Sequence, residues 1–155
     1  MSILNDQVHD VALSQDEDFR PWQMIEAQHL ICAYQSNKLP HALILTGPLG
    51  VSKQHFAEQL AFFLLCSSPD AGRACGRCKS CLLSLAGNHP DWTNIGPEEA
   101  HKVIRVDTIR MIHQRLQQTS QQGGNKVCII CPAENMNENA ANALLKVLEE
   151  PPADT

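Results

Sequence analysis

The chain has 155 residues, of which 43% are hydrophobic and 19% charged, and its formal net charge is −5 at pH 7. This composition is typical of a globular domain with a sizeable core, and the acidic balance excludes a general electrostatic attraction to DNA or anionic lipid, although not a role within a larger nucleic-acid assembly. The sequence has no apolar run of membrane-spanning length and no signal pattern at its start, so we expect a cytoplasmic protein with no membrane partner. Seven cysteines in such a chain favour metal binding or buried thiols over disulfides.

The N-terminal part of the sequence divides into a tail and a first helix. Residues 1–18 are polar and weakly patterned, so we interpret them as a flexible tail, with a short extra helix as the alternative. The ordered domain is then expected to span residues 19–155. Apolar residues at helical spacing predict a helix over residues 22–34, closed by Pro40. We expect Trp22 to pack in the core, the alternative being that it stacks on an adenine.

The next stretch has the layout of a phosphate-binding loop. An apolar run predicts a strand over residues 41–46, and an amphipathic run predicts a helix that begins at Ser52 or Lys53 and packs on a sheet. Between them, residues 47–54 read Gly-Pro-Leu-Gly-Val-Ser-Lys-Gln. In such loops the backbone N–H groups and the helix N-terminus attract an anion. The layout indicates an ATP site or the remnant of one.

This loop departs from the motif G-x-x-x-x-G-K-[S/T] at two positions. Ser52 stands where the second glycine belongs, and Gln54 stands where the hydroxyl residue belongs. Gln54 offers magnesium no hydroxyl ligand, and the Ser52 side chain crowds the approach of a phosphate. We therefore predict a vestigial loop that binds no nucleotide and contains no catalytic residue. Its residues are Gly47, Gly50, Ser52, Lys53 and Gln54.

Four cysteines within 16 residues are the strongest chemical signal in the sequence. One of them is separated by eight residues from three others that recur at every third position. Four thiolates that converge tetrahedrally select zinc, and because no coordination position is left for water, the ion is expected to be structural. We predict a zinc module over residues 66–81, with buried free thiols, disulfides or an iron–sulfur cluster as the alternatives. The predicted ligands are Cys66, Cys75, Cys78 and Cys81.

The remainder of the chain alternates helices and strands. We predict a short helix and a strand over residues 82–86 and 91–95, a helix and a strand over residues 108–118 and 126–131, and a last helix that ends before Pro151. The second of these strands is continuously apolar, as in a parallel sheet that is buried on both faces. Asp107 and Asn135 are the predicted N-caps of the two long helices, and the glutamine-rich end of the first is expected to fray.

The residues that follow the strand at 126–131 lack the groups of a nucleotide hydrolase. Such enzymes carry Asp-Glu here, and the two carboxylates hold magnesium and activate water. Cys131 and Pro132 can do neither. Cys128 and Cys131 are most simply core thiols, because residues three apart in a strand point to opposite faces. A C-x-x-C redox or metal pair is the alternative.

Residues 142–152, Asn-Ala-Leu-Leu-Lys-Val-Leu-Glu-Glu-Pro-Pro, resemble the segment after the second nucleotide motif in bacterial clamp-loader subunits of the AAA+ class. The cysteine module and the strings at residues 40–43 and 104–107 are also similar to that family, so the resemblance covers residues 19–155. It implies an AAA+ P-loop-type α/β domain of three layers with a parallel sheet, truncated after the third strand, into which the zinc module is inserted. Because the loop and the acidic motif are degenerate, the chain resembles the delta-prime type rather than the ATP-hydrolysing gamma/tau type.

The resemblance implies a stator in the DNA polymerase III holoenzyme, a DNA-directed DNA polymerase, with no ATPase activity of its own. The implied partners are gamma/tau and delta subunits in a hetero-pentamer, and through them the sliding clamp and primed DNA. The arginine that such subunits contribute to a neighbour would follow Thr155. An atypical gamma/tau-type ATPase and a zinc-containing nucleic-acid-binding module are the alternatives. Since the family's next strand would begin after Thr155, we expect residues 1–155 to be a fragment and marginally stable alone.

Overall fold

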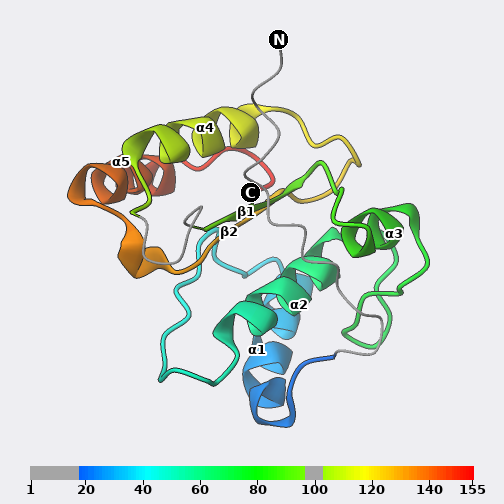
Figure 1. Ribbon diagram of the computed structural model, residues 1–155. Helices are drawn as coiled ribbons and strands as arrows, with labels where there is room; N and C mark the ends of the chain where they lie inside the picture. The colour runs from blue at the N-terminus through cyan, green and yellow to red at the C-terminus, as the bar shows by residue number, and fades with distance from the viewer. Residues whose placement is uncertain (1–17, 97–102) are drawn as a thin grey trace. The chain divides into compact units, whose positions relative to one another are not determined.

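The computed structural model describes residues 18–96 and 103–155 (Figure 1). The predicted tail, apart from its last residue, Asp18, lies outside this described part. The chain divides into two compact units between His89 and Pro90, and each is described by itself. None of the helices in the described part is long and apolar enough to cross a membrane.

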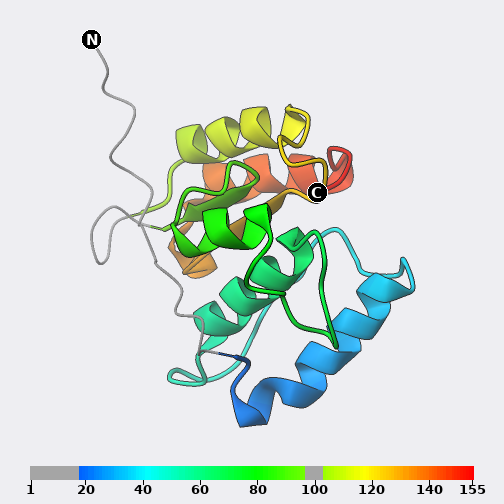
Figure 2. The same ribbon diagram turned by 90° about the vertical axis from the view of Figure 1, so that its right-hand side faces the viewer.

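The unit that ends at His89 is helical in its described part. Its elements are η1 (Pro21–Gln23), α1 (Met24–Gln35), α2 (Lys53–Leu65) and α3 (Lys79–Leu85). Helix α2 lies beside α1 in both views (Figure 1, Figure 2). Aromatic side chains join these elements, with ring centroids 5.3 Å apart for Phe19 and Phe56 and 5.7 Å apart for Tyr34 and Phe63. The core consists of Phe19, Ala27, Ile31, Phe56, Leu60 and Phe63.

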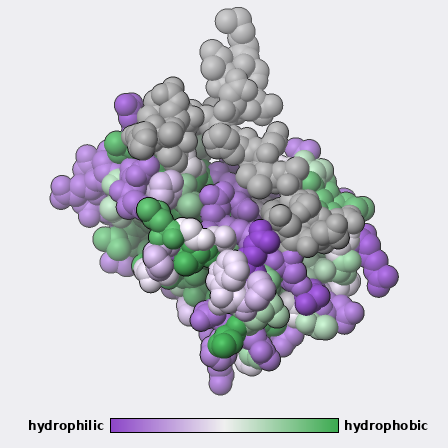
Figure 3. Space-filling model, turned by 60° about the horizontal axis from the view of Figure 1, so that its bottom comes forward, coloured by the Kyte–Doolittle hydropathy of each residue, from purple (hydrophilic) through white to green (hydrophobic). Residues whose placement is uncertain are grey.

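Two predictions for this unit are wrong. Residues 41–46 form no strand, and Ile44 is 88% exposed. An apolar run becomes a strand only where a neighbour completes its hydrogen-bond ladder, and within the described residues no strand pairs with this run. Trp22 is 62% exposed rather than packed in the core, and its indole N–H donates to the carbonyl oxygen of Val51, 3.4 Å away. Apolar side chains also reach the surface elsewhere, as the green areas of Figure 3 show.

The unit that begins at Pro90 is an α/β unit. Its elements are β1 (Trp92–Ile95), α4 (Val106–Gln117), β2 (Val127–Ile130), η2 (Ala133–Asn135) and α5 (Glu138–Glu149). The strands pair in parallel, with Trp92 opposite Val127 and Ile95 opposite Ile130, which confirms the predicted parallel strands. Helices α4 and α5 pack on each other (Figure 1, Figure 2). The core consists of Ile95, Ile104, Ile109, Ile112, Leu116, Ala140 and Val147.

Details of this unit correct the sequence-based predictions. Strand β2 is half-buried along its length rather than buried on both faces, because the sheet in the described residues has two strands. Arg105, not Asp107, is the N-cap of α4. Asn137, not Asn135, caps α5, and its side-chain oxygen accepts a hydrogen bond of 2.8 Å from the Ala140 N–H.

Two buried charged side chains hold the end of α4, where the glutamine-rich sequence predicts fraying. The ammonium group of Lys126 donates to the carbonyl oxygens of Leu116 and of Gln118, the latter at 2.9 Å. The carboxylate of Asp91 accepts hydrogen bonds from the Gln121 and Gln122 N–H groups at 2.8 and 2.9 Å. The lysine bonds satisfy carbonyl oxygens at the helix end, and the aspartate bonds hold the residues that follow, so the segment after α4 is anchored.

Candidate metal centre and phosphate-type loop

The phosphate-type loop ends in a backbone conformation that normally requires glycine. Ser52 is the N-cap of α2 and has φ 58° and ψ 43°, in the left-handed region. A serine held there adds strain on the order of 1–3 kcal/mol. The substitution that breaks the motif has therefore left the backbone turn in place, while adding a side chain at the position where a phosphate would approach.

The two polar side chains at the start of α2 are bonded to the protein itself. The Lys53 ammonium group donates to the carbonyl oxygens of Gly47 and Pro48, both at 2.9 Å. The Gln54 side-chain amide donates to the Glu58 carboxylate at 2.8 Å, and Glu58 is only 6% exposed. Both groups that would face a bound nucleotide and its metal thus have hydrogen-bond partners within the loop and helix.

Gln23 in η1 ties the loop to the start of the domain, and the sequence-based analysis missed it. Its side-chain amide donates to the carbonyl oxygens of Val51 and Ser52 at 2.9 and 3.0 Å, and its side-chain oxygen accepts from the Arg20 N–H at 3.1 Å. Gln23 is buried, so these bonds satisfy an amide that would otherwise be costly to bury. Gln23 belongs to no sequence motif or residue periodicity, so the sequence alone gives no sign of its contact with the loop.

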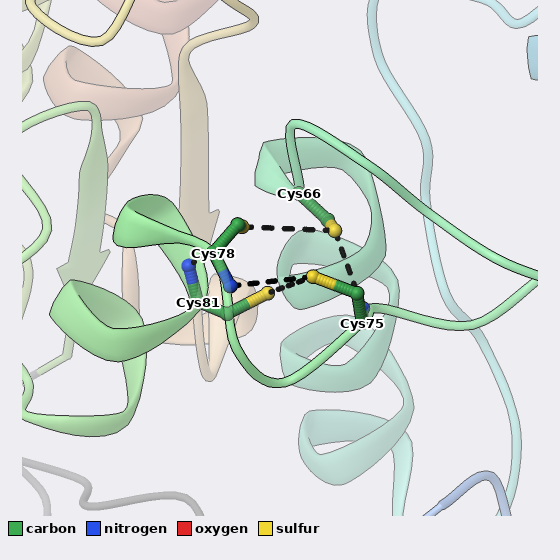
Figure 4. Close-up of side chains that lie close together, drawn as sticks. All are labelled: Cys66, Cys75, Cys78 and Cys81. Atoms are coloured by element: carbon green, nitrogen blue, oxygen red, sulfur yellow. Dashed lines mark hydrogen bonds between the residues drawn. The ribbon is translucent and has the colours of Figure 1, made fainter.

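The four predicted ligands lie together in one cluster, drawn in Figure 4. Cys66 is the C-cap of α2, Cys75 lies in the following loop, Cys78 is the N-cap of α3, and Cys81 lies within α3. All four sulfur atoms lie within 4.8 Å of one another. The Sγ atoms of Cys66 and Cys78 are 3.9 Å apart, as are those of Cys75 and Cys81. Zinc–sulfur bonds of 2.3 Å in a tetrahedron place the sulfurs about 3.8 Å apart, so the cluster fits a zinc ion.

Backbone N–H groups point at the sulfur atoms from outside the cluster. The N–H groups of Ser68 and Cys75 lie 3.4 and 3.3 Å from the Cys66 sulfur. The Cys78 N–H lies 3.3 Å from the Cys75 sulfur, and the Cys81 N–H lies 3.4 Å from the Cys78 sulfur. Such bonds stabilise thiolates and orient them as metal ligands.

The cluster has two thiols with lowered pKa values and two with raised ones. Burial opposes ionisation of Cys78, but hydrogen bonds from Ser67 and from the Cys81 N–H outweigh it and lower the pKa of Cys78 to about 6. The Arg77 N–H lowers the pKa of Cys75. Burial raises the pKa of Cys66 and, more strongly, that of Cys81. The low-pKa thiol of Cys78 offers an incoming cation a negative charge near neutral pH.

The sequence profile of the family described as "DNA polymerase III, delta subunit" matches residues 22–155. The chain belongs to this family. Similar proteins named "DNA polymerase III subunit delta'" include those of Pseudomonas aeruginosa, 48% identical over 145 residues, and Escherichia coli, 36% identical over 135 residues. These alignments cover 89% and 87% of this chain, but 41% and 40% of the relatives. The Bacillus subtilis protein of the same name is 34% identical over 121 residues, which are 78% of this chain and 36% of that protein.

This delta-family chain spans about two-fifths of the length of the relatives it matches. The match confirms the family resemblance drawn from residues 142–152. The structure brings the four predicted metal ligands together, and it places Gly47, Gly50, Ser52, Lys53 and Gln54 in one loop and helix start. Cys131 and Pro132 follow β2 as predicted. Cys128 packs against the core beside α4 and α5, and burial raises its pKa to about 12, as expected of a neutral core thiol.

Proposed function

We propose that this chain is part of a clamp-loader subunit that does not hydrolyse ATP and acts as a stator of a bacterial DNA polymerase III holoenzyme in the cytoplasm. Its partners are gamma/tau and delta subunits in a hetero-pentamer, which together load the sliding clamp onto primed DNA. The name "DNA polymerase III subunit delta'" of its relatives supports this role. The predicted domain over residues 19–155, with its inserted zinc module, stays part of the proposal.

The observation that carries the proposal is the internal bonding of the phosphate-type loop. An ATP-hydrolysing subunit needs a lysine that reaches the phosphates and a hydroxyl that binds magnesium. Here Lys53 is bonded to two carbonyl oxygens of its own loop, and Gln54 is bonded to Glu58. Cys131 and Pro132 supply no carboxylate. This combination favours a subunit that binds no nucleotide over the gamma/tau type of ATPase.

The cysteine cluster is proposed to hold one structural zinc ion through Cys66, Cys75, Cys78 and Cys81. The ion supplies a fourfold crosslink when bound. Because Cys66 is the C-cap of α2 and Cys78 is the N-cap of α3, this crosslink joins the ends of two helices. Its role is to fix the module, since four protein ligands leave no coordination position for a reacting water.

A groove of about 470 Å³ between α4 and α5 is the described surface that we assign to the DNA side of the assembly. Arg110, His113 and Lys146 line it, together with the amide side chains of Asn139 and Asn142. Cationic and amide groups of this kind bind phosphate oxygens without reading base sequence. An ion pair of 3.3 Å with Asp107 holds Arg110 on the surface of α4.

Reconstitution of clamp loading tests the proposal. The intact protein is combined with gamma/tau and delta subunits, sliding clamp and primed DNA, and loading is measured with and without it. We expect loading to require the protein and to proceed at the wild-type rate with Lys53→Ala. A complex that loads clamps equally well without the protein would overturn the proposed role, and loss of loading with Lys53→Ala would favour the ATPase alternative.

A further inference from the structure

The connection between the first two cysteines of the cluster contains a closed turn. In residues 70–73, the Asp70 N–H donates to the Arg73 carbonyl oxygen at 2.9 Å, and the Arg73 N–H donates back to Asp70 at 2.8 Å. The two central residues have positive φ, 46° at Ala71 and 78° at Gly72. This is the pattern of a type I′ turn. The loop from Cys66 to Cys75 therefore carries at its tip a turn that is closed by two backbone hydrogen bonds.

This turn is seated on α1. A Cβ atom added to Gly72 would lie 3.5 Å from both the Cδ1 and Cγ2 atoms of Ile31, an ordinary van der Waals distance, so the turn lies beside that side chain. Ile31 is buried in the core of the same unit. The positive φ of Gly72, rather than a lack of space, is therefore what favours glycine at this position.

Arg73 connects the turn to the start of the described chain. One guanidinium nitrogen of Arg73 lies 2.8 Å from a carboxylate oxygen of Asp18. The other Asp18 oxygen accepts the N–H of Phe19 at 3.0 Å, so the carboxylate is held on both sides. Both side chains are partly exposed, which limits the strength of the ion pair.

Asp18 is in turn fixed to α2, the helix whose C-cap is Cys66. Its carbonyl oxygen lies 3.0 Å from the Nε2 atom of His55. The next residue, Phe19, packs its ring against Phe56 on the same helix. A chain of contacts therefore runs from α2 through Asp18 and Arg73 to the tip of the cysteine loop.

We propose that Asp18 and Arg73 are positioning residues of the metal centre. Their ion pair holds the 70–73 turn, and the turn holds the loop so that Cys75 meets Cys66 in a geometry ready for the metal. This inference rests on the proposed zinc site. Ligands that are already held in the binding geometry before the metal arrives lose less conformational freedom on binding. Breaking the ion pair between Asp18 and Arg73 should therefore weaken zinc retention.

An electrostatic explanation makes the opposite prediction for one variant. A zinc–tetrathiolate carries net negative charge, so removal of a nearby carboxylate favours it and removal of a nearby cation disfavours it. Asp18→Asn keeps the side-chain size, removes the negative charge and breaks the ion pair. If only charge matters, Asp18→Asn should slow zinc release. If the ion pair positions the ligands, the same variant should speed zinc release.

The test measures zinc release from the intact protein to a chromogenic chelator. We expect Asp18→Asn and Arg73→Gln each to speed release by about two- to fivefold, the range that an exposed ion pair supports. The double variant should release zinc no faster than either single variant, because both remove the same contact. Arg77→Gln is the control, since Arg77 is an exposed arginine that lies between two of the ligands. It should change the rate less than Arg73→Gln.

The outcomes separate this inference from the zinc proposal. Wild-type protein that holds no zinc after purification under reducing conditions would overturn both. Wild-type protein that holds zinc, with Asp18→Asn releasing it at the wild-type rate or more slowly, would overturn the positioning role alone. Additive effects of Asp18→Asn and Arg73→Gln would also contradict it.

Discussion

The phosphate-type loop and the cysteine cluster lie in the same unit, and their polar groups are used in different ways. In the loop, the Lys53 ammonium group and the Gln54 amide have partners within the protein. In the cluster, four sulfur atoms face one another, and backbone N–H groups around them donate hydrogen bonds to three of the sulfurs. The polar groups of the loop are bonded within the protein, whereas the sulfur atoms of the cluster surround a position where a cation can bind. A motif therefore has to be judged by where its polar groups are bonded, as well as by its residues.

The largest expected effect is the loss of one thiol ligand. Cys81→Ser should reduce zinc content from one ion per chain to a small fraction of that, and it should lower stability by roughly 2–5 kcal/mol because metal binding is coupled to folding. Elemental analysis and thermal unfolding measure the two effects. Cys32→Ser, at an exposed cysteine outside the cluster, is the matched control and should change neither.

The pH dependence of zinc affinity should also be large. Burial raises the pKa of Cys66 and Cys81, so both thiols carry protons near neutral pH and must lose them to bind zinc. Apparent zinc affinity should therefore rise with pH by at least about 100-fold per unit near neutrality, and more steeply below pH 6, where Cys78 is protonated as well. Competition with a chelator at several pH values measures this slope. An affinity that is independent of pH would contradict thiolate ligation.

A smaller effect is expected where the loop is anchored. Gln23→Ala removes the amide that donates to Val51 and Ser52 and leaves two carbonyl oxygens without that donor. The free energy of unfolding should fall by about 1–3 kcal/mol, as measured by denaturant titration, while zinc content stays unchanged. Gln35→Ala, at an exposed glutamine at the end of α1, is a suitable comparison. Equal stabilities of the two variants would show that the hydrogen bonds of the Gln23 amide contribute nothing to the free energy of unfolding.

The smallest effect concerns the left-handed residue of the loop. Ser52→Gly relieves the strain of φ 58°, at the cost of greater freedom in the unfolded chain, so a net stabilisation of about 0.5–1 kcal/mol is expected. The melting temperature should rise slightly and should not respond to added MgATP. A nucleotide-dependent shift in this variant would mean that Ser52 alone keeps the loop from binding ATP.

The sequence predicted those features that depend on local spacing. The clustering of the four cysteines, helix α4 and the two strands at 92–95 and 127–130 follow from residue periodicity and chemistry. The prediction of a strand at 41–46 is wrong because strand formation depends on a partner strand elsewhere in the fold, which residue periodicity does not reveal. The contacts of Gln23, Asp18 and Arg73 join residues distant in sequence, and no motif marks them.

The central claim, that the loop is a closed structural turn, is tested most directly by titrating the intact protein with MgATP in a calorimeter. Lys53→Ala serves as the comparison, because it removes the one cation at the start of α2 that could hold a phosphate. We predict no saturable binding to either protein. Saturable, magnesium-dependent binding to the wild type that Lys53→Ala abolishes would contradict the account.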